Sequence, residues 1–457
     1  MALTLEITPG EVKRRLDSGE KLRLVDVREP FEFQQAQIEG SELIPMRSVP
    51  QSLASLASDE RGMIMLVRPK TLVVGGDAVS VRQMNAQLDG GATLFAGTDF
   101  GQRIANVYSR GTETVVAANL GQIVKRVHTE QEASQALRNS GFNDIKYLIA
   151  TRGESASQGD NRITVEFNGQ RHGIADWLAA PSPMGSLDYV SSNAGAAVSF
   201  VGKQPALMLD DIFSTIGASD PNFKQGLSQI NSELGLDLRN DLASALGGEV
   251  TLALDGPVLP TPSWKAVIEV NNSGALQVAI DKLVQSFNLD AQKSNRPGVT
   301  INQAQVGGRT FYTIESQVGG LSTEYDYTFA DGYMIMAPSR ALLLAALQTH
   351  ANGTSLARSA SFRALLPKDN QANFSAMIYQ NLSPILKPLA SQLTSGQLAL
   401  LQQLAVDAKP SVFCAYGESD RIEVASTGNL FDFSQGLPTL IHLLGLTDHG
   451  TSHQANP

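Results

Sequence analysis

One repeated unit constrains the fold of this chain more than any other feature: an apolar strand, a short polar turn, and a helix with leucine-type spacing. Five examples lie at residues 114–127, 197–213, 265–284, 333–347 and 374–390. Asn, Ser or a Lys-Gln-Pro triplet at the junction supplies the helix cap or the proline of the first helical turn. Two β-hairpin patterns lie between these units, at residues 145–169 and 310–336. We therefore expect an α+β fold of layered, mostly antiparallel sheets with covering helices.

Residues 1–62 show a different, α/β pattern. Thr8 is followed by proline and, three residues later, by Glu11, which is typical of a helix start. The continuous apolar run at residues 22–27 is typical of a buried parallel strand. Residues 38–46 indicate a second short strand that runs into a loop.

The stretch LVDVREPFEFQQAQIEGSELIPM, from Leu24 to Met46, resembles the first half of a rhodanese-like domain. That family opens with a strand ending in Asp-x-Arg, continues with a Glu-aromatic pair, and then has an HIxGA segment leading to xIP. The matching positions are Asp26, Arg28, Glu32, Phe33, Ile38, Gly40, Ile44 and Pro45. Gln37 stands where the family usually has histidine, and Ser41 where it usually has alanine. The resemblance covers about residues 4–60, which is only the N-terminal half of such a domain.

The resemblance implies a catalytic cysteine after the next parallel strand, in a Cys-x-x-Gly-x-Arg loop whose backbone N–H groups stabilise a thiolate. Residues 61–76 stand at that place and contain no cysteine. The sole cysteine of the chain is Cys414, and the pattern of residues 411–429 predicts a β-hairpin around it. We therefore expect Cys414 to be a small buried hydrophobe, and Asp26 and Arg28 to have structural roles.

Residues 63–445 resemble a family of uncharacterised bacterial envelope-type proteins. The phrase LGLDLRNDLASALGGEVTLALDGP at residues 234–257 is similar to a helix-to-strand corner of that family, and PTPSWKAVIEVNN and YTFADGYMIMAPSRALL are similar to other recurring phrases. The resemblance implies a position outside the cytoplasm, and it carries no activity and no site residues. A rhodanese-like half-domain stands before this module without a linker, whereas a natural fusion more often joins whole domains through a spacer. A chimeric or rearranged reading frame is therefore a hypothesis beside a fusion.

Composition excludes several classes of function. The formal net charge of -10 disfavours binding to nucleic acid. A single cysteine excludes an intrachain disulfide and a cysteine-cluster metal site. The six histidines form no HxH or HExxH pair, and His449 and His453 lie in a polar tail. We therefore expect no metal and no cofactor.

The sequence also bears on membranes and on localisation. No apolar run reaches the roughly 18 residues that a membrane-spanning helix needs. The N-terminus lacks the pattern of a signal peptide, so the chain as written is expected to be cytoplasmic. The apolar residues 437–446 predict a helix, followed by a disordered tail. Docking of this helix on a sheet of the same chain is the favoured interpretation, and contact with a membrane or with a partner is the alternative.

Three weaker constellations have structural interpretations. The glycines at 75–76 could hold a phosphate, but they lack the known phosphate-loop patterns and favour a tight turn. Glu324 and Asp326 fall on one strand face, which we expect to face water. Trp177 and Trp264 are expected to pack in the core.

These patterns predict four segments: a partial rhodanese-like segment at 1–62, an α+β module at 63–200, a second α+β module with strand-helix units at 201–430, and a C-terminal helix and tail at 431–457. We expect a non-enzymatic protein without sulfurtransferase activity, whose large module has a binding or structural role. Two alternatives stay open: a sulfurtransferase-type or sulfur-relay regulatory protein that uses Cys414 or a partner's cysteine, and a truncated or chimeric envelope binding module. No catalytic, cofactor-binding or metal-binding residue can be assigned, and a protein partner stays open.

Overall fold

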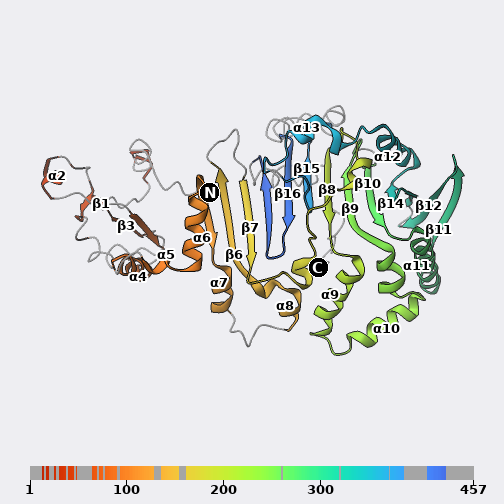
Figure 1. Ribbon diagram of the computed structural model, residues 1–457, viewed down its shortest axis with the longest axis horizontal. Coiled ribbons are helices and arrows are strands. Elements are labelled where there is room, and N and C mark those ends of the chain that lie inside the picture. The colour runs from red at the N-terminus through yellow and green to blue at the C-terminus, as the bar shows by residue number, and fades with distance from the viewer. Residues whose placement is uncertain are drawn as a thin grey trace, which may run out of the picture. The chain divides into compact units, whose positions relative to one another are not determined.

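The structure is a computed structural model that divides the chain into two compact units, Met1–Ala105 and Asn106–Pro457 (Figure 1). The residues that it describes are 13–14, 17–19, 25–26, 30–35, 37, 40–45, 48, 64–68, 71–75, 78–89, 93–127, 135–153, 161–258, 261–318, 321–369, 371–384 and 409–428. Each unit is described separately below.

The first unit contains short strands in two small sheets. Its elements are β1 (Val25–Asp26), α2 (Pro30–Gln35), β2 (Glu42–Leu43), β3 (Ile64–Arg68), β4 (Thr71–Gly75), α4 (Ala78–Asp89) and α5 (Thr93–Ala96). β1 and β2 pair in parallel, with α2 between them in sequence, as the resemblance to a rhodanese-like domain implies. β3 and β4 instead form an antiparallel hairpin, and the described residues show no pairing between this hairpin and β1 or β2.

The second unit is built on one large sheet. Its strands are β5 (Thr112–Ala118), β6 (Ile145–Gly153), β7 (Asn161–Phe167), β8 (Ala196–Val201), β9 (Leu246–Leu254), β10 (Trp264–Val270), β11 (Val299–Val306), β12 (Arg309–Val318), β13 (Leu321–Ala330), β14 (Tyr333–Ala337), β15 (Ala376–Gln380), β16 (Ser411–Gly417) and β17 (Arg421–Ser426). The 13 described strands lie in the order β11-β12-β13-β14-β10-β9-β8-β15-β16-β17-β7-β6-β5. All neighbouring pairs are antiparallel.

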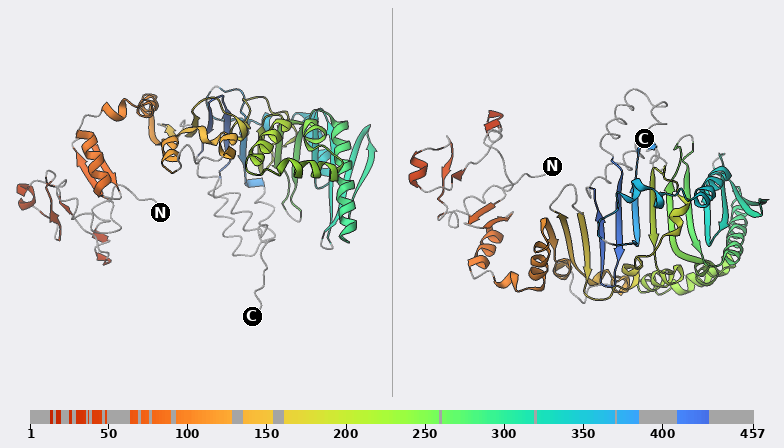
Figure 2. Two further views of the ribbon diagram at one scale, coloured as in Figure 1. Left: turned by 90° about the horizontal axis from the view of Figure 1, so that it is seen from below. Right: turned by 45° about the horizontal axis from the view of Figure 1, so that its top comes forward.

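Helices connect the strands and lie mainly at their ends. The helices and helical turns are α6 (Asp99–Tyr108), α7 (Leu120–Val127), α8 (Gln135–Ser140), η1 (Phe142–Asp144), η2 (Gly173–Asp176), η3 (Gly185–Tyr189), α9 (Pro205–Gly217), α10 (Phe223–Leu234), η4 (Leu238–Leu242), η5 (Ala243–Ala245), α11 (Ser273–Lys293), α12 (Arg340–Asn352), η6 (Leu356–Arg358) and α13 (Ala360–Arg363). α8, α9 and α10 lie at one end of the strands, whereas α12 and α13 lie at the other (Figures 1 and 2).

The expected strand-helix units are confirmed where the structure describes them. β8 leads into α9, β10 into α11, and β14 into α12. α9 begins at Pro205, and the side chain of Asn272 caps α11 by accepting a hydrogen bond from the Ala275 backbone N–H at 2.9 Å. These local signals explain why the α+β fold class is confirmed.

The order of the strands is not local in sequence. β15 lies between β8 and β16, although about 175 residues separate it from β8. The predicted modules 63–200 and 201–430 therefore both contribute strands to this sheet, and residue 200 itself lies inside β8. The boundaries after residues 62 and 430 stay predictions.

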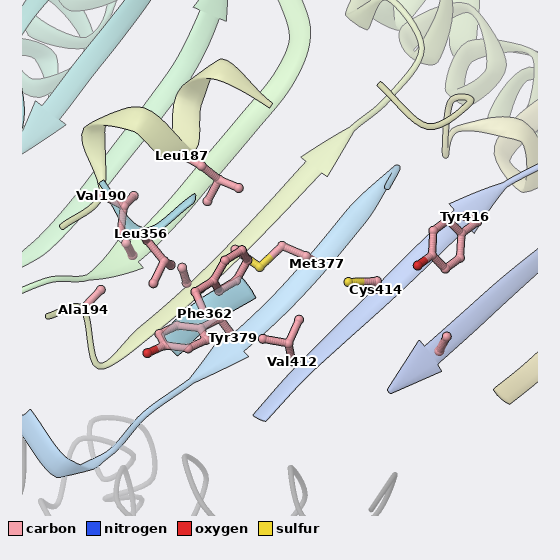
Figure 3. Close-up of a cluster of buried hydrophobic side chains, with 13 residues drawn as sticks. Leu187, Val190, Ala194, Leu356, Phe362, Met377, Tyr379, Val412, Cys414 and Tyr416 are labelled. Atoms are coloured by element: carbon pink, nitrogen blue, oxygen red, sulfur yellow. The ribbon is translucent and has the colours of Figure 1, made fainter. Parts of the chain in front are cut away.

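The main core lies on one face of the central strands β8, β9, β15, β16 and β17 (Figure 3). The segments around η3 and η6 cover this face. Their side chains Leu187, Val190 and Leu356 are buried in the same cluster as Met377 and Tyr379. Close packing on this face fixes the register of five strands, since a shift by one residue would turn every side chain to the other face.

Candidate functional site

Cys414 is a core residue of β16, as the sequence predicts. Its side chain is 0% exposed and lies beside Met377 of β15 and Ala425 of β17 in the strand register (Figure 3). A thiolate acts as a nucleophile only where it is accessible and where N–H groups or positive charge lower its pKa. The Cys414 side chain is 0% exposed, so it does not meet the condition of access.

The residues that resemble a rhodanese-like domain have the local geometry of a strand-helix-strand unit. Asp26 ends β1, and its carbonyl oxygen accepts a hydrogen bond from the Ile44 backbone N–H at 2.9 Å. Ile44 is 5% exposed, and Gly40 has a left-handed φ of 81° that favours glycine. Arg28 lies outside the described residues. The described matching positions thus support the local fold, and the chain has no cysteine in this region.

The expectation that Asp326 faces water is wrong. Glu324 is exposed, but Asp326 on the same face of β13 is 0% exposed. Its carboxylate accepts a hydrogen bond from Thr313 Oγ1 at 2.6 Å and lies 3.4 Å from the guanidinium of Arg340. Arg340 opens α12, so a helix that follows in sequence closes over this end of the strand. The described contacts give Asp326 a structural role.

A buried ion pair joins two neighbouring strands and a loop. Lys265 Nζ on β10 lies 2.6 Å from Asp255 Oδ2, and the two side chains are 2% and 5% exposed. The same carboxylate accepts hydrogen bonds from the backbone N–H of Ser191, at 2.8 Å, and from its hydroxyl. The arrangement holds the loop after η3 against the sheet, and sequence reasoning missed it because Ser191 and Asp255 are 64 residues apart in the chain.

Glu249 forms a second polar cluster in the core. It is 6% exposed and accepts hydrogen bonds from the Ser186 backbone N–H at 2.6 Å and from the Tyr333 hydroxyl at 3.0 Å. Burial, together with the nearby charge of Glu249, raises the pKa of Tyr333 above its ordinary value. These contacts satisfy the hydrogen bonding of a buried carboxylate.

The face of the sheet opposite the main core is also apolar. We call it the apolar sheet face, and its residues are Ile163, Val165, Phe200, Val198, Val250, Leu252, Ala376, Ile378, Phe413, Ala415, Ile422 and Val424. The register places them on one side, because Leu252 pairs with Val198, Val198 with Ile378, and Ile378 with Phe413. No described helix packs extensively on β7, β8, β15, β16 or β17. Leu252 is 56% exposed and Val198 is 45% exposed, whereas Phe413 is 8% exposed.

A shallow cavity of about 330 Å³ lies at the exposed end of this face. It is lined by Val198, Leu252, Leu254 and Trp264, among others. Trp264 is half-buried rather than a full core residue, and its ring lies 5.7 Å from that of Tyr325. Trp177 is also half-buried, and its indole N–H donates to Asp211 Oδ2 at 3.1 Å. The sequence predicted that both tryptophans pack in the core. This prediction is correct only in part, because both side chains are half-buried.

Several expected features fall outside the described residues or give no site within them. Gly75 ends β4, but the following glycine of the expected turn is outside the described part, as are residues 437–446 and both histidines of the tail. Among the described residues, no group of His, Cys, Asp or Glu could hold a metal ion. No helix in this part of the chain is long and apolar enough to cross a membrane.

Comparison with known proteins extends the resemblance of the N-terminal residues to a rhodanese-like domain. The sequence profile of the rhodanese-like domain matches residues 8–118, which is further than the expected end near residue 60. The chain is 40% identical over 68 residues to "Probable adenylyltransferase/sulfurtransferase MoeZ" of Mycobacterium tuberculosis, in the strains CDC 1551 / Oshkosh and ATCC 25618 / H37Rv. This match covers 15% of the chain and spans only 15% of the length of those proteins.

The larger unit has a family but no known function. No solved structure matches the chain. A second sequence profile matches residues 175–415, which is more than half of the chain and includes β8 to β16 of the large sheet. The chain therefore belongs to the family described as "Protein of unknown function (DUF3352)".

Proposed function

We propose that this chain is a non-enzymatic binding protein, in which a rhodanese-like segment without sulfurtransferase activity is fused to the large sheet. One observation carries the proposal: the sole thiol of the chain, Cys414, is 0% exposed in the core of β16. Rhodanese-type transfer requires a thiolate that accepts sulfur as a persulfide, and the thiolate must be reached by the donor.

The surroundings of Cys414 oppose access by a sulfur donor. Its neighbours across the strands are Met377 and Ala425, and the cluster around it is apolar or aromatic. A structural cysteine buried in this way is inert because reagents do not reach it. The matched rhodanese-like region, residues 8–118, contributes no cysteine of its own.

A binding role accounts for the remaining features. The described polar clusters, including Lys265 with Asp255, satisfy one another and hold loops in place. The net charge of -10 favours a partner other than nucleic acid.

The test is a thiosulfate-to-cyanide sulfur-transfer assay on the full chain, with an active cysteine-containing rhodanese-like protein in parallel. Intact-mass measurement after incubation with the sulfur donor shows whether the chain gains a sulfur atom. We expect neither thiocyanate production nor a mass increase in the native protein. The Cys414→Ala variant should give the same result as the unchanged chain.

Two outcomes would contradict the proposal. Thiocyanate production that is lost in Cys414→Ala would assign the activity to this thiol. Sulfur transfer that appears only when a second, cysteine-containing protein is added, and that depends on Asp26, would instead favour a sulfur-relay role.

A further inference from the structure

The apolar sheet face lacks the pattern of a sheet face that stays in water. An antiparallel sheet with one solvated face alternates between apolar and polar side chains along each strand. Here β8, β9, β16 and β17 carry apolar residues on both faces, and the apolar sheet face has no charged side chain. Exposed apolar areas of this kind are usually covered by another element or by a partner.

The described chain ends within this face. β17 lies between β16 and β7, next to the β7 edge of this face. The Gly428 carbonyl accepts a hydrogen bond from Asn161 Nδ2 at 2.7 Å, and the Thr427 hydroxyl donates to the Leu365 carbonyl at 2.8 Å. These bonds fix the position of Thr427 and Gly428, the last described residues.

The residues that follow have the composition of a docking segment. Residues 429–446 contain Asp432 as their only acidic or basic residue apart from His442. The leucines and isoleucine at 437, 440, 441 and 444 recur at intervals of three and four, which is the spacing of one helix face. Residues 437–446 would span roughly 15 Å as a helix, which is about half the thickness of a bilayer's hydrocarbon core.

The distances allow this segment to reach the exposed part of the face. Four strand steps separate β17 from β9, and at about 4.8 Å for each step this is roughly 19 Å. The residues from 429 to 437 can span about 30 Å when extended. Docking therefore requires no rearrangement of the sheet.

We propose that residues 429–446 dock on the apolar sheet face and pack their leucines over Val198 and Leu252. The occupant is a segment of this chain because it starts at the face, matches its apolar character and stays tethered beside it, which raises its effective concentration. The proposal is independent of whether the chain transfers sulfur.

Cysteine pairing in the full chain tests the proposal. The variant Leu252→Cys/Leu440→Cys is oxidised or treated with a short bifunctional maleimide, and the products are separated and mapped by mass spectrometry. Cys414 can be kept, because it is buried, and the two single variants show whether it reacts. We expect a link within one chain between positions 252 and 440.

The matched control is Leu207→Cys/Leu440→Cys. Leu207 is a leucine of similar exposure, 49%, and it lies in α9. α9 follows the C-terminal end of β8, whereas Gln380 pairs with Ala196 at the N-terminal end of that strand. We expect little linkage in this control. A link between two chains at position 252 would overturn the proposal in favour of a second copy, and equal linkage at 207 and 252 would also overturn it.

A second measurement covers the case in which linkage fails for geometric reasons. The Leu252→Cys thiol should react with a maleimide at least tenfold more slowly in the full chain than in a chain that ends at Gly428. Equal rates would overturn the proposal. A further contrary result is an apolar molecule that copurifies with the protein and slows the maleimide reaction equally in the full chain and in the chain that ends at Gly428. This result would also overturn the proposal, since the face would then bind a separate partner.

Discussion

At the scale of single residues, the structure depends on buried charges that are paired. Lys265 and Asp255 are withdrawn from water together, and Ser191 completes the hydrogen bonding of the carboxylate. Such a pair contributes little net stability compared with apolar residues, but removing one partner leaves a charge buried alone. The cost of that isolated charge is a measurable quantity.

We expect Lys265→Ala to lower the free energy of unfolding by about 3 to 5 kcal/mol, because it leaves the Asp255 carboxylate without its cation. Urea unfolding followed by circular dichroism measures the change. The control is Arg296→Ala, since Arg296 and Asp290 form an exposed pair at 2.6 Å, with side chains 55% and 67% exposed. Its effect should stay within about 1 kcal/mol, and equal effects of the two variants would contradict the role of burial.

The thiol of Cys414 gives a second prediction at this scale. Because its side chain is 0% exposed, it should not react with an aromatic disulfide reagent in the native protein. One thiol per chain should react rapidly once the protein is unfolded in guanidinium. Rapid native reaction would show that β16 opens easily, and it would also remove the main support for the proposed function.

The sequence predicted the side of a strand on which a residue lies better than the extent to which the residue is buried. It placed Glu324 and Asp326 on the same side of a strand, which the structure confirms, but it placed both in water. Depth depends on Arg340 of α12, which reaches the Asp326 carboxylate from another element. Cys414 was predicted correctly because the apolar residues on both sides of it are its sequence neighbours.

At the scale of elements, the hairpin of β16 and β17 is held by a buried arginine. Arg171 donates to the carbonyl oxygens of Glu418 at 2.6 Å, Ala175 at 2.9 Å and Leu178 at 2.9 Å. Burial lowers the pKa of Arg171, and the neighbouring Asp176 partly opposes this shift. The loop that contains η2 is thereby tied to the turn region of the hairpin.

Gly417 sits at the closest approach of these two elements. A Cβ atom at this position would lie 2.5 Å from the Ala179 carbonyl oxygen and 2.6 Å from that of Leu178. We therefore expect Gly417→Ala to destabilise the protein by about 1 to 3 kcal/mol, because backbone must shift to admit the methyl group. Thermal unfolding measures the effect.

The control is Gly226→Ala, near the start of α10. A Cβ atom there would meet nothing within 4 Å, so the substitution should stabilise the helix by up to about 1 kcal/mol. If both variants had the same effect, the contact at Gly417 would not be the cause.

The strand-helix units could be read from the sequence because their signals are local. Pro205 and Asn272 mark the starts of α9 and α11, and the runs before them are strands. The hairpin of β3 and β4 was missed because the resemblance implied a parallel strand at that place. Local apolar runs do not distinguish parallel from antiparallel pairing.

At the scale of the whole molecule, strand order decides what the surface can do. The position of β15 between β8 and β16 joins the row Leu252, Val198, Ile378 and Phe413 into one apolar face. No sequence pattern specifies this order, because it depends on pairings between segments far apart in the chain. The sequence therefore predicted the apolar strands, but it did not predict that they combine into one apolar face.

The large sheet buries tyrosines whose ionisation affects the stability of the whole molecule. Burial raises the pKa of Tyr327 to about 12, and it raises the pKa of the others above the ordinary value near 10. The others are Tyr189, Tyr333, Tyr379 and Tyr416. In each case the folded protein holds the phenolic proton more tightly than the unfolded chain does.

The contribution of these tyrosines to the free energy of unfolding should therefore be constant below pH 10. It should fall as the pH rises from 10 towards 12. In this range the unfolded chain releases tyrosine protons that the folded protein keeps, so each buried tyrosine lowers the free energy of unfolding by up to about 1.4 kcal/mol per pH unit. Urea unfolding at several pH values measures the slope, and the absorbance of tyrosinate shows whether ionisation coincides with unfolding. Tyr327→Phe should reduce the slope, because it removes one of these groups together with its hydrogen bond to Gln277. Tyrosinate absorbance that rises near pH 10 in the folded protein would show that these hydroxyls are reached by solvent, and the sheet would then be less closely packed than its burial indicates.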